Sequence, residues 1–165
     1  MRIPDNGDHR GGFTLVELIV VLVILAIASL MVIPGVASLG DVSATSAARL
    51  LAGDLQYAQN AAITYQQPVT VAFNTATESY GLTNASGPLI HPMTKADYTV
   101  DLPSQRGFEG ANVVSASFGG SPAVTFDELG APDSAGSVTL QVGPHVYRVD
   151  VAAATGKVTV SVVES

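Results

Sequence analysis

The feature that most constrains this chain is a long apolar run close to its N-terminus. From Leu18 to Ile33, fifteen of sixteen residues are apolar, and no charged residue occurs between Glu17 and Asp41. A helix needs roughly 20 mostly apolar residues to cross the hydrocarbon core of a bilayer. A buried helix of a soluble protein is the alternative, but such helices usually keep a polar stripe. We therefore expect residues 13–40 to form a transmembrane helix.

One acidic side chain sets this segment apart from ordinary apolar N-termini. A cleaved secretory signal has a shorter apolar region of ~7–15 residues, and residues 34–38 only weakly resemble its cleavage site. A plain signal anchor has no use for a carboxylate. Yet Glu17 is the fifth residue of the segment that begins at Phe13. Because a carboxylate costs ~2.5–3.5 kcal/mol near the centre of a spanning helix, and less near an end, Glu17 requires a functional partner.

The residues around Glu17 form a longer pattern, Arg10-Gly11-Gly12-Phe13-Thr14-Leu15-Val16-Glu17-Leu18. It resembles the class III signal of type IV pilins and type II secretion pseudopilins, in which a short polar leader ending in Gly precedes Phe-Thr-Leu-x-Glu and an apolar run. The resemblance implies that a prepilin peptidase cleaves between Gly12 and Phe13 and methylates the new amino group of Phe13. Residues 1–12 are then a leader peptide, and the mature subunit has 153 residues.

Cleavage would also supply the partner that Glu17 requires. It creates an ammonium group on Phe13, and Glu17 follows four residues later, about one helical turn away. The carboxylate can pair with this ammonium in the same chain or in a neighbouring subunit. In the second case the ion pair fixes how two neighbouring helices are aligned along their axes. Assembly is then favoured because it removes the cost of an unpaired carboxylate in lipid. We therefore expect Glu17 to be an assembly residue, and Pro34 to kink the helix.

The resemblance also implies a location and a set of partners. Arg10 lies next to the apolar run, and the positive-inside tendency keeps such an end cytoplasmic. The expected location is the bacterial inner membrane, crossed once with the head in the periplasm, and then the filament. The expected partners are the prepilin peptidase, other pseudopilins or pilins through the N-terminal helix, and the inner membrane before assembly. No nucleic acid is expected.

The periodicity after the apolar run changes twice. Residues 41–66 are expected to continue the helix, because Ala and Leu recur at spacings of three and four from Ala44 to Ala62, with Asp54 off the apolar stripe. From Pro68 the period becomes two, as in strands. The sequence thus predicts an α+β fold, with a long N-terminal helix packed on an antiparallel β-sheet head at 67–165. The expected strands are 69–73, 79–83, 98–102, 112–118, 123–126, 137–142, 145–151 and 157–163.

The head carries a second resemblance. Residues 49–63 followed by 68–73, the segment Val124-Thr125-Phe126-Asp127-Glu128-Leu129-Gly130, and the ending at 147–151 and 155–158 resemble the H-type minor pseudopilins, the GspH/FimT-like family. This likeness implies a pilin-like fold and a structural role in the pseudopilus of a type II secretion system. A major pilin often carries a C-terminal disulfide loop, which a chain without Cys cannot form.

Catalytic and metal-binding patterns are missing from the sequence. It has no nucleophile elbow, Walker loop or dinucleotide-binding turn. Of its three histidines, His9 belongs to the leader, and His91 and His145 lack metal-ligand spacing. The acids between Asp127 and Asp133 do not match an EF-hand loop, so an acidic turn is expected and calcium binding stays open. We expect neither an enzyme nor a cofactor.

The alternative is a minor type IV pilin involved in pilus priming or DNA uptake. DNA binding requires Lys or Arg placed to meet phosphates. Residues 41–165 contain five Lys or Arg and eleven Asp or Glu, a net charge of −6. Of these five cations, only Lys157 lies after residue 150. The charge therefore favours secretion over DNA capture.

Overall fold

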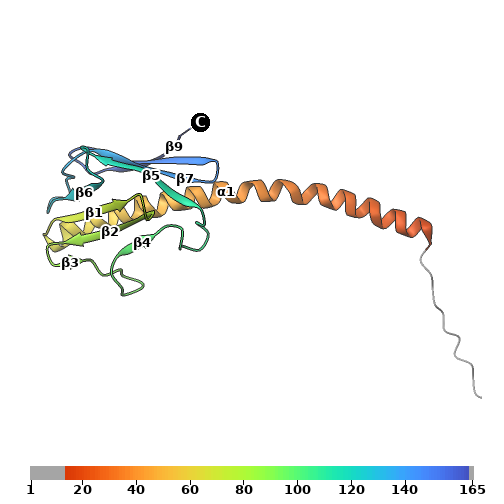
Figure 1. Ribbon diagram of the computed structural model, residues 1–165, viewed down its shortest axis with the longest axis horizontal. Helices are drawn as coiled ribbons and strands as arrows, with labels where there is room; N and C mark the ends of the chain where they lie inside the picture. The colour runs from red at the N-terminus through yellow and green to blue at the C-terminus, as the bar shows by residue number, and fades with distance from the viewer. Residues whose placement is uncertain (1–13, 164–165) are drawn as a thin grey trace, which may run out of the picture. The chain divides into compact units, whose positions relative to one another are not determined.

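The N-terminal part of the protein is a long helix. The computed structural model describes residues 14–163, and for residues 28–42 it describes the helical backbone without the side chains. The chain divides into two units, Met1–Ser38 and Leu39–Ser165. Helix α1 (Leu15–Tyr65) includes residues of both units, and is drawn from red to yellow in Figure 1. The predicted long helix is thus confirmed over these residues.

The described part of the head consists of strands in two antiparallel sheets. The first contains β1 (Val69–Asn74), β2 (Ser79–Asn84), β3 (Gly87–Pro88) and β6 (Ala123–Phe126) in the order β3-β2-β1-β6, with β4 (Thr99–Asp101) also paired to β2. The second contains β5 (Ala111–Phe118), β7 (Gly136–Val142), β8 (His145–Val151) and β9 (Val158–Val163) in the order β5-β7-β8-β9.

The α+β prediction is confirmed, with one refinement of the sheet. The predicted strands at 123–126 and 145–151 coincide with β6 and β8. The predicted strand at 98–102 is one residue longer than β4 at each end, and the other predicted strands differ by one residue at one end. The short β3 was not predicted. The structure also divides the strands between two sheets, because β6 returns to pair with β1, Val69 opposite Phe126, while β5 joins the other sheet.

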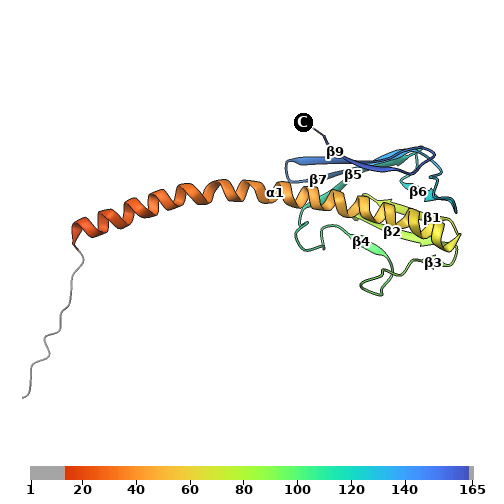
Figure 2. The same ribbon diagram turned by 180° about the vertical axis from the view of Figure 1, so that it is seen from behind.

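The core of the head forms where the second half of α1 meets the sheets. Figures 1 and 2 show this part of the helix against β1 and β2, with the β5-β7-β8-β9 sheet along another side. Small side chains let the strands approach the helix closely, and Phe73 of β1 stacks on Phe118 of β5 at 5.9 Å between ring centroids. The fully buried helical residues are Ala44, Ala47, Ala48, Leu51, Leu55, Ala58 and Ala62.

Candidate functional site

The predicted assembly residue, Glu17, lies in the first turn of α1. The Glu17 backbone N–H donates to Thr14 Oγ1 at 3.2 Å, and the Leu18 N–H donates to the Thr14 carbonyl at 3.2 Å. Thr14 therefore acts as the N-cap, with Glu17 at the third helical position of a T-x-x-E pattern. The helix dipole favours a negative charge there. This role of Thr14 was not predicted, although the four-residue pattern carries its signal.

Glu17 lies on a helical surface that is apolar and exposed over residues 14–27. Every residue from Thr14 to Ile27 is exposed, and the large aliphatic side chains among them range from 48% exposed at Val21 to 76% at Leu15. Within residues 14–163, no partner is recorded for the Glu17 carboxylate. A helix that is apolar on all sides is stable only in apolar surroundings, such as lipid or other apolar helices.

The structure does not describe the residues of the predicted cleavage site. Gly12 and Phe13 lie outside the described residues, as do the side chains of residues 28–40. The backbone at Pro34 is helical, and its kink stays a prediction. Within the described part of the chain, no helical stretch is both long and apolar enough to span a membrane.

The prediction that Asp54 lies off the buried face of the helix is wrong. The Asp54 side chain is only 7% exposed, and it accepts hydrogen bonds from the hydroxyls of Tyr80 at 2.5 Å and Tyr98 at 3.0 Å. Burial raises the pKa of Asp54 above its ordinary value, although the two hydroxyl donors act in the opposite direction. The two tyrosines are 26 and 44 residues away in sequence, so no local pattern reveals the partners of this acid.

Asp54 is expected to give the head an unusual pH dependence. Because its folded pKa is raised above the unfolded value of about 3.9, its contribution to stability is fully present at low pH and falls as the pH rises through the folded pKa. The asparagine of Asp54→Asn is neutral at every pH, so the stability of this variant does not show the decline that Asp54 causes. In urea unfolding of the full chain in detergent, the stability of Asp54→Asn relative to the native protein should therefore rise from pH 4 to pH 7. The exposed Asp97→Asn is the control, and a constant difference for Asp54→Asn would contradict the assignment.

A glutamine clamp joins the last turns of α1 to two loops of the head. Gln59 Nε2 donates to the carbonyls of Gly130 at 2.7 Å and Thr155 at 2.9 Å. Gly130 and Gly156 have φ angles of +81° and +63°, and a Cβ on Gly156 would lie 2.4 Å from Gln59 Nε2. Glycine is therefore required at both turns. Both glycines lie in head segments that resemble the H-type pseudopilins.

The side chains of Asp127, Asp133 and His91 accept hydrogen bonds from nearby backbone N–H groups. Asp127 Oδ1 accepts two backbone N–H groups, at 2.9 and 2.8 Å, and Asp133 Oδ1 accepts one at 3.2 Å. His91 Nδ1 accepts two backbone N–H groups, at 3.2 and 3.3 Å. Within the described residues, no group of three or more His, Asp or Glu is placed to hold a metal ion. The acidic loop is thus held as a turn by its own carboxylates.

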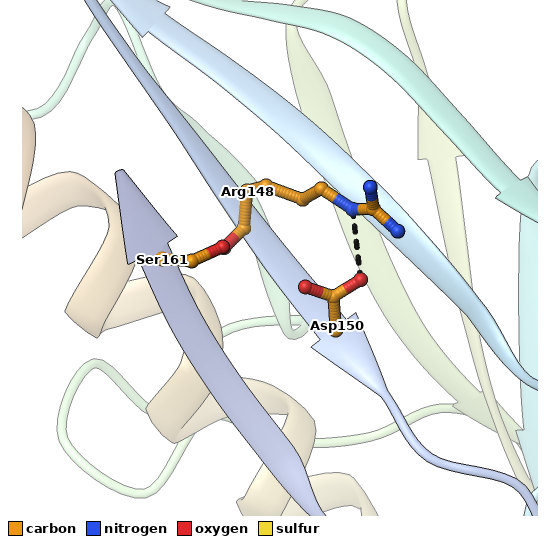
Figure 3. A network of polar contacts seen from close by, with 3 residues as sticks. All are labelled: Arg148, Asp150 and Ser161. Atoms are coloured by element: carbon orange, nitrogen blue, oxygen red, sulfur yellow. Dashed lines mark hydrogen bonds and ion pairs between the residues drawn. The ribbon is translucent and has the colours of Figure 1, made fainter. Parts of the chain in front are cut away.

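The basic side chain of Arg148, in β8, forms an ion pair with an acid of the same strand. Arg148 Nε donates to Asp150 Oδ1 at 2.8 Å, as Figure 3 shows, and its backbone carbonyl accepts a hydrogen bond from Ser161 Oγ at 3.4 Å. Arg148 and Lys157 line an open depression of about 420 Å³, which Asp150 also lines. A phosphate approaching this depression would meet an acid beside the two cations.

Comparisons with known proteins agree with this architecture. Residues 47–156 match the family model of the type II transport protein GspH, and residues 8–33 match the prokaryotic N-terminal methylation motif. The minor pseudopilin EpsH from the type II secretion system of Vibrio cholerae has 14% identity and a TM-score of 0.55, over 73% of this chain and 97% of that chain. The type IV minor pilin FimU of Pseudomonas aeruginosa PAO1 has 16% identity and a TM-score of 0.52, over 72% and 87%. No curated protein sequence gave a significant match.

The long helix, the methylation motif and the antiparallel head define a pilin-like protein. The chain belongs to the family of the type II transport protein GspH, whose model covers most of its head. The predicted resemblance to H-type minor pseudopilins is thereby confirmed. The solved structures add that the fold is shared with a pseudopilin and with a type IV minor pilin.

Proposed function

We propose that this chain is a structural minor pseudopilin, assembled into the pseudopilus of a type II secretion system and without catalytic activity. The observation that carries the proposal is the GspH family match over residues 47–156. The folds of this family and of its structural neighbours are those of pseudopilins and pilins, which work as filament subunits. The methylation motif at residues 8–33 supports the same role.

The proposed path to the filament starts with processing. A prepilin peptidase removes residues 1–12 by cutting between Gly12 and Phe13, and methylates the new amino group of Phe13. Residues 13–40 anchor the subunit in the inner membrane as a single span, residues 41–66 continue the helix, and residues 67–165 form the head in the periplasm. The exposed apolar surface around Val21 supports an anchor that passes from lipid into a filament core.

Glu17 then provides the register of assembly. After processing, the ammonium of Phe13 lies about one helical turn before Glu17. Both charges lie at the apolar end of the subunit, where an unpaired charge is costly. A neighbouring subunit lowers that cost when its ammonium lies beside the Glu17 carboxylate, or its carboxylate beside the Phe13 ammonium. Contact with other pseudopilins is therefore favoured at one axial offset between the two helices. Thr14 supports the arrangement by capping the helix turn that holds Glu17.

The second candidate, a minor type IV pilin that serves pilus priming or DNA uptake, has one observation in its favour. FimU shares the fold at a TM-score of 0.52, and a common fold leaves the function open. The charge distribution opposes the DNA-uptake form of this role. Residues 41–165 carry a net charge of −6, and Arg148 is paired with Asp150.

A gel-shift assay with the full chain in detergent separates the two roles. A pseudopilin with this charge should not shift duplex DNA beyond weak non-specific binding, whose Kd is roughly 10⁻⁴–10⁻⁶ M. Asp150→Asn provides a matched variant, because it frees Arg148 without adding a cation. Tight binding by the native chain that disappears between about 50 and 200 mM salt would favour DNA uptake.

A further inference from the structure

Strand β9 forms an edge of the second sheet that the described residues leave unpaired. It pairs with β8 on one side and is the last strand in the order β5-β7-β8-β9. Its sequence, Val158-Thr159-Val160-Ser161-Val162-Val163, contains no charge, no proline and no glycine. Its register with β8 runs without a bulge. Charges, prolines and bulges are the features that commonly keep an edge strand from pairing with another chain, and β9 has none of them.

The opposite edge of the same sheet is protected. Strand β5 has a register shift between Val113 and Ser115, and the Val113 N–H donates to the Glu78 carboxylate. A bulge and a side-chain acceptor thus interrupt β5 as a template for a further strand. The open edge of β9 is therefore a specific property of that strand and not of the whole sheet.

The backbone groups that β9 presents at its open edge belong to three valines. The Ala152 N–H donates to the Lys157 carbonyl at 3.0 Å, which makes these residues a hydrogen-bonded pair at the start of the β8–β9 ladder. Hydrogen-bonded and non-hydrogen-bonded pairs alternate along an antiparallel ladder. The backbone groups of Thr159 and Ser161 therefore point towards β8. The residues whose N–H and C=O groups point towards the open edge are Val158, Val160 and Val162.

The side chains of these valines continue the core face of the sheet. Val160 lies opposite Val149 in the ladder, and Val162 lies opposite Tyr147. Residues that lie opposite one another in a ladder point to the same face. Tyr147 and Val149 are buried, whereas Val160 is 39% and Val162 62% exposed. The apolar layer of the head therefore extends onto β9, where it is left exposed.

An extended polypeptide meets both requirements of this edge. Its backbone supplies donors and acceptors at the spacing of a β-ladder, and every second side chain points to the face on which Val160 and Val162 are exposed. A lipid chain or an aromatic ligand could cover the valines, but would leave the row of backbone groups unpaired. On the other face, the β9 side chains Thr159 and Ser161 are uncharged, so uncharged polar residues suit the partner there.

A second copy of this chain does not fit the edge. Strand β9 runs opposite to α1, because Gln59 bonds to Thr155 just before β9, whereas Thr45 bonds to Tyr147 at 2.8 Å, beside Val162 near the other end of the strand. Antiparallel pairing of two β9 strands would make the α1 helices of the two heads run in opposite directions, which does not suit subunits anchored in one membrane. Parallel pairing would turn the valine faces to opposite sides of the sheet.

We propose that a different protein adds an extended segment to β9 as the fifth strand of the second sheet. The apolar residues of that segment alternate with uncharged polar residues. The apolar residues cover Val160 and Val162, and the polar ones lie beside Thr159 and Ser161. Its backbone pairs with the outward N–H and C=O groups of the valines. The exclusion of a second copy rests on the proposed function, and the rest of the inference rests on the head alone.

The test uses the full chain in detergent and the blocked peptide Lys-Thr-Val-Thr-Val-Thr-Val-Thr-Lys as the probe, with amide hydrogen exchange followed by NMR. In the free chain, the amides of Val160 and Val162 should exchange faster than those of Thr159 and Ser161, which are bonded to β8. Saturating probe should slow the exchange of the two valines by about tenfold or more, because a paired amide exchanges only when the ladder opens. The blocked peptide Lys-Thr-Thr-Thr-Thr-Val-Val-Val-Lys has the same composition without the alternation, and should give no such protection.

Three variants test the two features of the edge separately. Val162→Lys places a charge on the face to be covered and should weaken binding of the probe by about tenfold or more. Thr159→Lys is the matched control, because it places the same charge on the other face, and should bind as the native chain does. Val160→Pro removes an outward N–H without removing a bond to β8, and should also abolish binding. Because Val162 is 62% exposed, circular dichroism of Val162→Lys should match that of the native chain.

Three results would overturn the proposal. The first is that the alternating probe leaves the exchange of the valine amides unchanged. The second is equal protection by the two peptides, or an equal effect of Val162→Lys and Thr159→Lys. The third is a native dimer in sedimentation that Val162→Lys makes monomeric, because a second copy would then occupy the edge. Any of these results alongside a secretion defect on deletion of the gene would refute this inference and leave the proposed function standing.

Discussion

Replacing Gly12 by valine is expected to stop processing, so that only the 165-residue precursor accumulates. The proposed cut lies directly after Gly12, and a β-branched side chain there adds bulk and restricts the backbone at the bond to be cleaved. Intact mass spectrometry of the membrane fraction, from cells that contain the prepilin peptidase, measures the outcome. The native chain should appear as 153 residues with a methylated Phe13 amine.

Gly11→Val is the matched control for this experiment. It places the same side chain one residue further from the proposed cut, and should still give the mature subunit. A Gly12→Val chain of mature length would place the cleavage elsewhere. A native chain that keeps residues 1–12 in the presence of the peptidase would remove the basis for the Phe13 ammonium, and with it the proposed partner of Glu17.

Replacing Glu17 by alanine is expected to leave membrane insertion and cleavage intact and to reduce assembly. Loss of the carboxylate leaves the Phe13 ammonium unpaired in an apolar layer, where a charge costs up to ~2.5–3.5 kcal/mol. A difference of 1.4 kcal/mol corresponds to a factor of ten. Cross-linking of the Glu17→Ala subunit to other pseudopilins should therefore fall by about tenfold or more.

Two further variants identify the cause of such a loss. Val16→Ala shortens an exposed neighbour in the same turn, and should assemble normally. Glu17→Gln keeps the size of the side chain and removes its charge, so it should resemble Glu17→Ala if the ion pair is what matters. Incorporation of Glu17→Ala at the native level would refute the assembly role.

Elements that depend on local periodicity were predicted well from the sequence. The predicted segments 123–126 and 145–151 coincide with β6 and β8. Burial alternates along the whole of β6 and along β8 from Tyr147 to Val151. The division into two sheets was not predictable, because it depends on pairs distant in sequence such as Val69 with Phe126. A two-residue strand such as β3 contains too few residues for a period to appear.

The same distinction applies to the functional residues. Glu17 was found because one acid inside an apolar run is visible in the sequence itself. The burial of Asp54 was missed, because its partners Tyr80 and Tyr98 come from other elements. Tertiary contacts decide these features, and the helix periodicity alone places Asp54 on the polar side.

The central claim is that this chain is a structural subunit of a type II secretion pseudopilus. Deleting its gene in the organism that encodes it, and measuring exported proteins in the medium and in the periplasm, tests the claim most directly. The proposed role predicts that secreted proteins accumulate in the periplasm, that the native gene restores their export, and that the Glu17→Ala gene does not. Normal secretion combined with a loss of pili or of DNA uptake would contradict it, and would assign the chain to a type IV pilus.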